Sequence, residues 1–467
     1  MIYLLTIYCV LFAILAWKRI DWAVAFVIFC LPTYLIRFSV FGLPMTLLEV
    51  MILLLFVVWL IKKVTNAANF YKYYKSVTLS NYKWWILIFL FFATVSVFVS
   101  PDRTVALGIW KAYFIEPILF FVVLINIPRL KSGVKLVSLI TGALGASALV
   151  VAIPAIIQKF WPIGIENSFW AAEATRRVVS WYGFPNAVGL YLAPIVILFL
   201  GLIIVFFGKG RRDKSRLYSW VFVLSCFCVL VPLSAIIFAR SEGALFGILA
   251  AVIFLGLFYP NKRLRLISLV SLVSLVLLVS FIPQARTYAV DKISLSDHSG
   301  QIRVQQWKET WTMLTDGREV FGAGLAGYQT TIEPYHAEGI WIEDKQDPEW
   351  LRKVLYNEEF KKQAWQPTEI YMYPHNIILN FWSEIGLFGM LVVLVLGMKF
   401  LMNYWKVKNR ENQKIYLVLI AVMVAILVHG LVDVPYFKND LSVFWWLLFA
   451  VGWLVSRSKT KIEFCKI

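Results

Sequence analysis

Residues 244–283 read ALFGILAAVIFLGLFYPNKRLRLISLVSLVSLVLLVSFIP. Two apolar runs, 244–259 and 266–283, flank a short polar turn with three basic residues. A helix needs about 20 mostly apolar residues to cross the hydrocarbon core of a bilayer. The stretch therefore predicts two membrane-spanning helices joined by a tight basic turn.

The same pattern repeats along the whole chain of 467 residues, of which 60% are hydrophobic and 15% charged, with a mean hydropathy of +0.75. Soluble domains carry about 25% charged residues, so the composition excludes a water-soluble globular protein. The sequence predicts an all-α polytopic membrane protein with 12–13 transmembrane helices, because the first two runs are short and closely spaced. The predicted spans lie near residues 2–17, 20–36, 43–61, 84–100, 112–127, 136–159, 187–207, 220–239, 244–259, 266–283, 376–400, 416–434 and 441–456.

One long polar loop interrupts the series of spans. Residues 284–374 carry 14 of the 27 acidic residues of the chain. We expect this loop to form a partly helical extracytoplasmic domain between two transmembrane units, 1–283 and 375–467. Within it, the spacing of apolar residues predicts an amphipathic helix over 301–314, and Asp347-Pro348-Glu349 predicts the start of a second helix that ends near Lys362. The glycine-rich segment 321–327 is expected to form flexible turns.

Basic residues are unevenly distributed between the two sides of the predicted bundle. If the basic segment 208–219 is cytoplasmic, the loops on that side hold 27 Lys and Arg residues and the short loops on the other side hold 8. The positive-inside rule then predicts a cytoplasmic C-terminus and, with thirteen spans, an external N-terminus. The net charge of +18 therefore reflects membrane topology and adhesion to anionic lipid, and no nucleic-acid partner is expected.

Cysteine and metal motifs give little support to a disulfide framework or a metal site. The five cysteines lie in apolar runs or at the C-terminus, without a CxxC pair. The sequence contains no GxxxxGK[ST], HExxH, DxD or Trp-Trp-Asp-Tyr-Gly motif. A multi-histidine metal site would require His298, His336 and His375 to meet in one external pocket, which we regard as the weaker interpretation.

Ionisable residues at the edges of the spans are the most informative, because each is costly there without a partner or a function. Arg240 lies in the short outer hairpin between the eighth and ninth spans, where an interfacial arginine is an equally good interpretation. Arg303 lies on the predicted amphipathic helix, where a surface role is the simpler one. His375, followed by Asn376, opens the eleventh span, a position at which hydrogen-bonded interface histidines are common.

Other charged residues accompany this set. Arg176, Arg177 and Asn186 precede the seventh span on the same outer side, where they could contact lipid headgroups. Glu384 follows His375 by two to three helical turns and is predicted either to orient it or to make a structural hydrogen bond.

Three further groups of residues are candidates for a structural or a functional role. His429 and Asp433, spaced i, i+4, fit a structural pair or a proton relay. Lys111 and Glu116 are predicted to form an internal ion pair. The tryptophans of the external loop could stack on sugar rings, but anchoring and packing is the favoured role.

Two arginines and a histidine on one side of a membrane form a specific combination. A guanidinium binds phosphate oxygens bidentately and keeps its charge, and a neutral imidazole can accept a proton from a hydroxyl. Arg240, Arg303 and His375 therefore suit a reaction in which a hydroxyl displaces a phosphate leaving group from a lipid-anchored donor.

The ordered motifs resemble the O-antigen ligase family of integral-membrane glycosyltransferases, which also includes O-antigen polymerases and bacterial O-linked oligosaccharyltransferases. The resemblance covers about 100–453 and includes the large outer loop before Pro374-His-Asn. Its pieces are, in chain order, Ser100-Pro-Asp-Arg, Trp110-Lys, Glu116-Pro, Gly183-Phe-Pro-Asn, Ala239-Arg-Ser-Glu-Gly, Arg303 with Trp307, Phe321-Gly-Ala-Gly, and Pro374-His-Asn with Glu384, Gly386 and Gly389.

This resemblance implies a metal-independent, inverting glycosyltransferase without a cofactor, located in the inner (plasma) membrane. It implies that a glycan moves from undecaprenyl diphosphate to an acceptor hydroxyl on the outer face, as in O-antigen ligation to lipid A-core. By the same resemblance, Arg240 and Arg303 hold the diphosphate and His375 is the general base, with Arg176, Arg177, Asn186, Asn376 and Glu384 in support. A polymerase of O-antigen or exopolysaccharide would use the same site, and a transporter of lipid-linked glycans is the less favoured alternative. The sugar, the acceptor and the oligomeric state stay open.

Overall fold

The computed structural model describes residues 2–40, 42–65, 82–127, 133–207, 216–344 and 347–458. Most of these residues are helical, and eight of the described helices are long and apolar enough to cross a membrane. The predicted class, an all-α polytopic membrane protein, is confirmed. Cys465 and most of the basic segment 208–219 lie outside the described residues.

Every predicted span contains a helix of the bundle. The bundle helices are α1 (Ile2–Lys18), α2 (Ile20–Phe29), α3 (Leu47–Thr65), α5 (Lys83–Val99), α6 (Arg103–Ile109), which continues through a π-helical turn η2 (Trp110–Ile115) into α7 (Glu116–Asn126), α8 (Gly133–Phe160), α10 (Pro185–Phe207), α11 (Arg216–Ala239), α12 (Glu242–Phe258), α13 (Lys262–Phe281), α19 (Ile377–Met402), α20 (Arg410–His429) and α21 (Asn439–Arg457).

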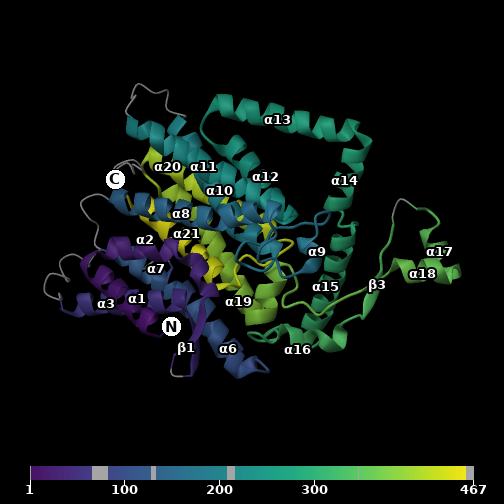
Figure 1. The fold of residues 1–467 in the computed structure, drawn as a ribbon, viewed down its shortest axis with the longest axis horizontal. Coiled ribbons are helices and arrows are strands. Elements are labelled where there is room, and N and C mark those ends of the chain that lie inside the picture. Colours follow the sequence, from purple (N-terminus) through teal and green to yellow (C-terminus); the bar gives the residue numbers. More distant parts are fainter. Residues whose placement is uncertain are drawn as a thin grey trace.

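Short elements connect these helices. They are η1 (Leu31–Leu35), α9 (Ser168–Ala171), α14 (Pro283–Ile293), α15 (His298–Thr315), α16 (Tyr328–Ile332), η3 (Glu333–Tyr335), α17 (Trp350–Tyr356), α18 (Glu358–Ala364) and η4 (Asn403–Lys406). Two antiparallel ribbons complete the fold: β1 (Arg37–Val40) pairs with β2 (Leu43–Thr46), and β3 (Gly339–Trp341) pairs with β4 (Trp365–Pro367). Figure 1 shows α14 and α15 beside the end of the bundle where α12 begins and α20 ends.

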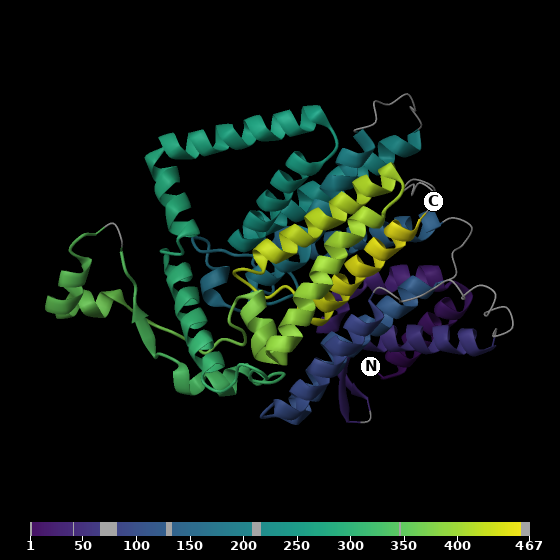
Figure 2. The same cartoon turned by 180° about the vertical axis from the view of Figure 1, so that it is seen from behind.

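The centre of the bundle is formed by α10, α20 and α21, whose most apolar windows are 83%, 72% and 89% buried. At the other extreme, α13 has no buried residue and runs apart from the other helices of the bundle in both views (Figures 1 and 2). Beyond α15, the loop continues into the ribbon β3–β4, which carries α17 and α18 away from the helices (Figure 2).

Two predicted spans near the start of the chain have wrong boundaries. The span predicted over 20–36 is a helix of 10 residues, which at 1.5 Å per residue is about 15 Å long and too short to cross a bilayer alone. Pro32 lies at the start of the 3-10 helix η1 that follows, and the chain then turns through β1 and β2. The latter occupies the first residues of the predicted span 43–61, so the helix there begins at Leu47.

The helix predicted over 416–434 is also displaced. It begins at Arg410, because the Asn409 side chain accepts hydrogen bonds from the first backbone N–H groups, and it ends at His429 before Gly430. Asp433 therefore lies in the following loop and not on the helix.

The loop predictions are partly confirmed. The amphipathic helix is present as α15 and ends before Asp316 and Gly317. The second loop helix is wrong in its extent, since α17 begins at Trp350 and Asn357 then caps a separate helix, α18.

The glycine-rich segment 321–327 forms the predicted turns, but these pack closely against the bundle. Ala323 and Leu325 are buried, and the Ala323 N–H donates to the Ser383 carbonyl at 2.7 Å. Gly322 has φ +68°, and a Cβ there would meet the backbone of α19. The segment thus needs glycine for a close approach.

Lys111 and Glu116 do not pair with each other. Lys111 instead contacts the Glu49 carboxylate at 3.1 Å. Both carboxylate oxygens of Glu116 are buried without a hydrogen-bond partner, so the predicted internal ion pair is wrong.

Candidate active site

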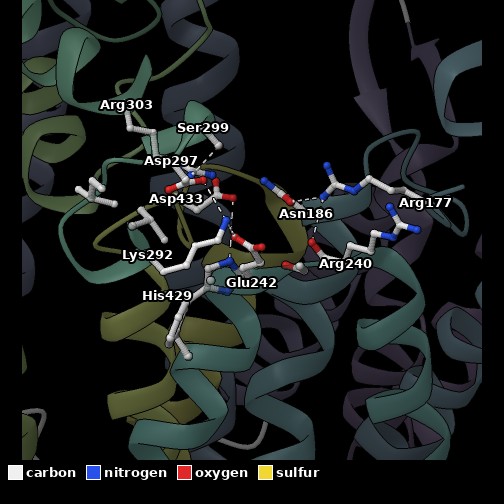
Figure 3. A pocket seen from close by; sticks show the side chains of 15 residues that line it. Arg177, Asn186, Arg240, Glu242, Lys292, Asp297, Ser299, Arg303, His429 and Asp433 are labelled. Atoms are coloured by element: carbon white, nitrogen blue, oxygen red, sulfur yellow. Dashed lines mark hydrogen bonds and ion pairs between the residues drawn. The ribbon is translucent and has the colours of Figure 1, made fainter. Parts of the chain in front are cut away.

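A polar pocket of about 340 Å³ lies where α12 begins and α20 ends. Its walls come from the turn at 240–241 and the first residues of α12, from the α14–α15 segment of the long loop, and from the end of α20 with the loop after it. Of the predicted site residues, Arg177, Asn186, Arg240 and Arg303 line it. Figure 3 shows Arg240 and Arg303 on opposite sides of the pocket, with Asn186 between them.

Arg240 lies on a strained turn. Its φ of +51° is in the left-handed region, which costs a residue with a Cβ about 1–2 kcal/mol. Arg177 supports this turn: its guanidinium donates to the Ala239 carbonyl at 3.0 Å, the Arg240 carbonyl at 3.3 Å and the Asn186 side chain at 3.0 Å. Burial and the charges of Arg240 and Arg303 lower the pKa of Arg177. Strained backbone of this kind is typical of functional sites.

Arg240 and Arg303 lack carboxylate partners. Arg303 donates one hydrogen bond to the Ser299 hydroxyl at 3.0 Å, and the Arg240 side chain is exposed. Neither guanidinium lies within 4.0 Å of a carboxylate among the residues that the structure describes. Both charges are therefore available to an anionic ligand.

Lys292 lines the pocket beside Arg177, Arg240 and Arg303 and was not predicted from the sequence. It contacts Glu242 at 2.6 Å and Asp297 at 2.9 Å, and Tyr288 donates a further hydrogen bond to Glu242 at 3.1 Å. Burial opposes the Lys292 charge, but the hydrogen bonds to both carboxylates raise its pKa above the ordinary value. The contact connects the start of α12 with α14, so it fixes Arg303 relative to Arg240.

His375 contacts the pocket wall through Asp433. Its Nδ1 lies 3.6 Å from Asp433 Oδ1, and His429 Nε2 lies 3.9 Å from Asp433 Oδ2. Burial opposes the Asp433 charge, but His375 and His429 hold the pKa of Asp433 below its usual range. The predicted contact of His429 with Asp433 is thus present, and His375 joins it. His375 is also strained, with φ +46°.

Three predicted supporting residues have structural contacts outside the pocket. Arg176 donates to the backbone carbonyls of Lys159 and Ala171. Asn376 caps α19 and donates to the Leu431 carbonyl, which joins the His375 turn to the loop after α20.

Glu384 accepts a hydrogen bond from the Ala326 N–H at 2.9 Å. Of the two roles predicted for it, the structural hydrogen bond is the one observed. Asp433, and not Glu384, is the carboxylate beside His375.

The three external histidines lie at different places. His298 contacts Gln366 at 3.1 Å, and His336 contacts Glu309 and Thr368, each at 3.2 Å. They do not meet His375 in one pocket, so the alternative of a site built from these three is wrong.

Residues 227–394 match the model of a protein family described as O-antigen ligase. This segment belongs to the O-antigen ligase family. It contains Arg240, Arg303 and His375, together with Lys292, and it is shorter than the predicted resemblance over about 100–453. No curated protein matches the chain. The match of this segment to the O-antigen ligase family supports a membrane protein that transfers glycans and implies lipid-linked glycan substrates.

Proposed function

We propose that this protein is a metal-independent, inverting glycosyltransferase that moves a glycan from an undecaprenyl-diphosphate-linked donor to an acceptor hydroxyl. One observation carries the proposal: two guanidinium groups without carboxylate partners line the same pocket as the carboxylate that contacts His375. Cations for a leaving diphosphate and a candidate base therefore occur together.

Arg240 and Arg303 would bind the diphosphate. Each guanidinium can donate two hydrogen bonds to phosphate oxygens and neutralise charge as the leaving group departs. Because the Arg240 side chain is exposed, it is free to rotate toward a ligand between it and Arg303. Stabilisation of developing charge is typically worth about 10²–10³ in rate per donor, which replaces protonation of the leaving group.

His375 would act as the general base. If its Nδ1–H points to Asp433, the lone pair of Nε2 is left to accept the proton of the acceptor hydroxyl. The acceptor oxygen then forms a bond to the anomeric carbon as the bond from that carbon to the diphosphate oxygen breaks, and the diphosphate leaves with the electron pair. A single displacement inverts the anomeric configuration.

We place the pocket on the extracytoplasmic face of the inner (plasma) membrane. The distribution of basic residues over the loops supports this side, and so does the large loop, here proposed to be the domain 284–374, which supplies Arg303 and Lys292. The transmembrane units 1–283 and 375–467 then supply Arg240 and His375, and the C-terminus is cytoplasmic.

The test compares the wild type with His375→Ala in membranes that receive a lipid-diphosphate-linked glycan and a candidate acceptor. General-base assistance is worth about 10²–10⁴, so we expect the variant to insert normally and to lose nearly all transfer. Retention of more than about a tenth of the activity would remove His375 from the role of base.

The products also separate two functions that the same pocket supports. One His375-dependent glycoconjugate on a gel indicates a ligase that acts on lipid A-core or another acceptor. A His375-dependent ladder indicates a polymerase. Equal lanes from both inserted proteins would overturn transfer at this pocket and favour transport of lipid-linked glycans.

A further inference from the structure

Helix α13 is the least packed of the long apolar helices in the described part of the chain. None of its most apolar window is buried, whereas the other seven windows are 28–89% buried. Both cartoon views show it apart from the bundle (Figures 1 and 2). Its path is nevertheless fixed at both ends.

The first half of α13 contacts α12 directly, and the end of α13 is connected to α12 through α14. A Cβ on Gly256 would overlap the Ser268 side chain, so the two helices touch there. At the other end, the Lys292 ammonium lies 2.6 Å from the Glu242 carboxylate. Glu242 and Gly256 are 14 residues apart on α12, which is about 21 Å at 1.5 Å per residue.

Between these two contacts the facing sides of both helices are apolar and partly exposed. Helical spacing places Phe246, Leu249 and Ile253 on the side of α12 that carries Glu242 and Gly256. Phe246 and Leu249 are each 41% exposed.

On α13, burial identifies the side that faces α12. Leu264, Ser268, Leu272 and Val279 are half-buried and lie on one face at helical spacing. Leu275 lies on the same face and is 41% exposed. We call the six residues Phe246, Leu249, Ile253, Leu272, Leu275 and Val279 the α12–α13 surface.

The α12–α13 surface is continuous with the pocket, because Phe246 also lines the pocket that holds Arg240 and Arg303. We infer that this surface binds the isoprenoid chain of the donor while its diphosphate lies between the arginines. The inference rests on the proposed function and adds the recognition of the lipid part of the substrate. A ligand with an anionic head and a long apolar tail fits a cationic pocket that opens onto an apolar surface.

The experiment measures transfer with two donors that carry the same glycan diphosphate, one on a long isoprenoid chain and one on a short, water-soluble isoprenyl chain. Leu249→Trp and Leu275→Trp fill the surface from opposite sides, so one can replace the other if either fails to insert. Leu230→Trp, on α11, is the matched control, since Leu230 is 62% exposed and lies outside both the surface and the pocket.

We expect the two surface variants to raise KM for the long-chain donor about tenfold without changing KM for the short one, and the control to change neither. If all three variants behave alike while the wild type uses both donors, the inference is wrong and the proposed function stands. If the wild type transfers from neither donor, the proposed function is wrong and the inference falls with it. If the surface variants alter the oligomeric state in detergent and not KM, the surface binds a second copy of the chain and the inference is overturned.

Discussion

At the scale of single residues, two of the five non-glycine residues with positive φ in the described part of the chain are residues assigned to chemistry. Arg240 and His375 have φ values of +51° and +46°. Glycine would adopt these angles without a steric penalty. Such strain is retained when the surrounding contacts hold it, as Arg177 does at the Arg240 turn.

This strain predicts that two substitutions at Arg240 differ in stability but not in activity. Arg240→Gly should be more stable than Arg240→Ala by about 1 kcal/mol, since only glycine relieves the positive φ. Both variants should lose transfer, because both lack the guanidinium. Thermal unfolding in detergent, measured together with transfer, checks this, and an alanine variant as stable as the glycine variant would contradict it.

The contact between Asp433 and His375 predicts a positioning role for the carboxylate. Asp433→Asn keeps the shape of the side chain but removes the charge 3.6 Å from His375 Nδ1. We expect kcat to fall about tenfold to a hundredfold, because the carboxylate contributes only part of the rate acceleration by a general base. The KM for the donor should stay nearly constant. Asp316→Asn is the control, because Asp316 accepts a hydrogen bond from Tyr335 at 2.6 Å in the external loop. An equal effect of both changes on kcat would argue against the role.

The same residues show what sequence alone can identify at a site. Arg240, Arg303 and His375 stand at span boundaries or on a predicted helix, so their types and order were readable. Asp433 is 58 residues after His375, and its contact depends on where α20 ends. Lys292 was one of 10 basic residues in a polar loop, and only the fold of α14 onto α12 distinguishes it.

At the scale of elements, hydropathy identified each helix of the bundle but misplaced some ends. Apolar periodicity predicts that a segment prefers a membrane or a core, and α2 is as apolar as a span while being only 10 residues long. Its length is set by Pro32 and by the ribbon β1–β2, features that a hydropathy count does not weigh. The close packing of the glycine-rich segment is not predictable from the sequence, because glycine permits both loose turns and close packing, and the partner, α19, lies far away in the chain.

The contact between Lys292 and Glu242 makes a prediction about two elements. Lys292→Met should loosen α14 and α15 from α12, raise KM for the donor several-fold and increase proteolysis within 282–300. Lys353→Met is the matched control, because Lys353 contacts Asp347 at 2.6 Å beside α17, away from the pocket. Steady-state kinetics and limited proteolysis in detergent measure both effects. Unchanged KM and proteolysis in Lys292→Met would show that this contact does not hold Arg303 in place.

At the scale of the whole molecule, the elements with catalytic assignments gather at one end of the bundle. The pocket is built where α12 begins and α20 ends, and the loop elements α14 and α15 lie beside that end (Figure 1). The turn between α19 and α20 lies at the start of α20, at the opposite end of that helix from the pocket. It contains Lys406 and Lys408. The proposed topology therefore places the two ends on opposite sides of the membrane, with the turn in the cytoplasm because of the excess of basic residues there.

This arrangement predicts how two engineered cysteines react in a background without the native ones. Gln363→Cys lies on the exposed side of α18 and Lys408→Cys on the exposed turn before α20. In intact cells, a membrane-impermeant thiol reagent should label Gln363→Cys and should reach Lys408→Cys only after the membrane is permeabilised. Labelling of Lys408→Cys alone would invert the topology and place the pocket in the cytoplasm, where an acceptor on the outer surface could not reach His375. Equal labelling of both sites after permeabilisation is the control, because it shows that each thiol is reactive once the reagent has access.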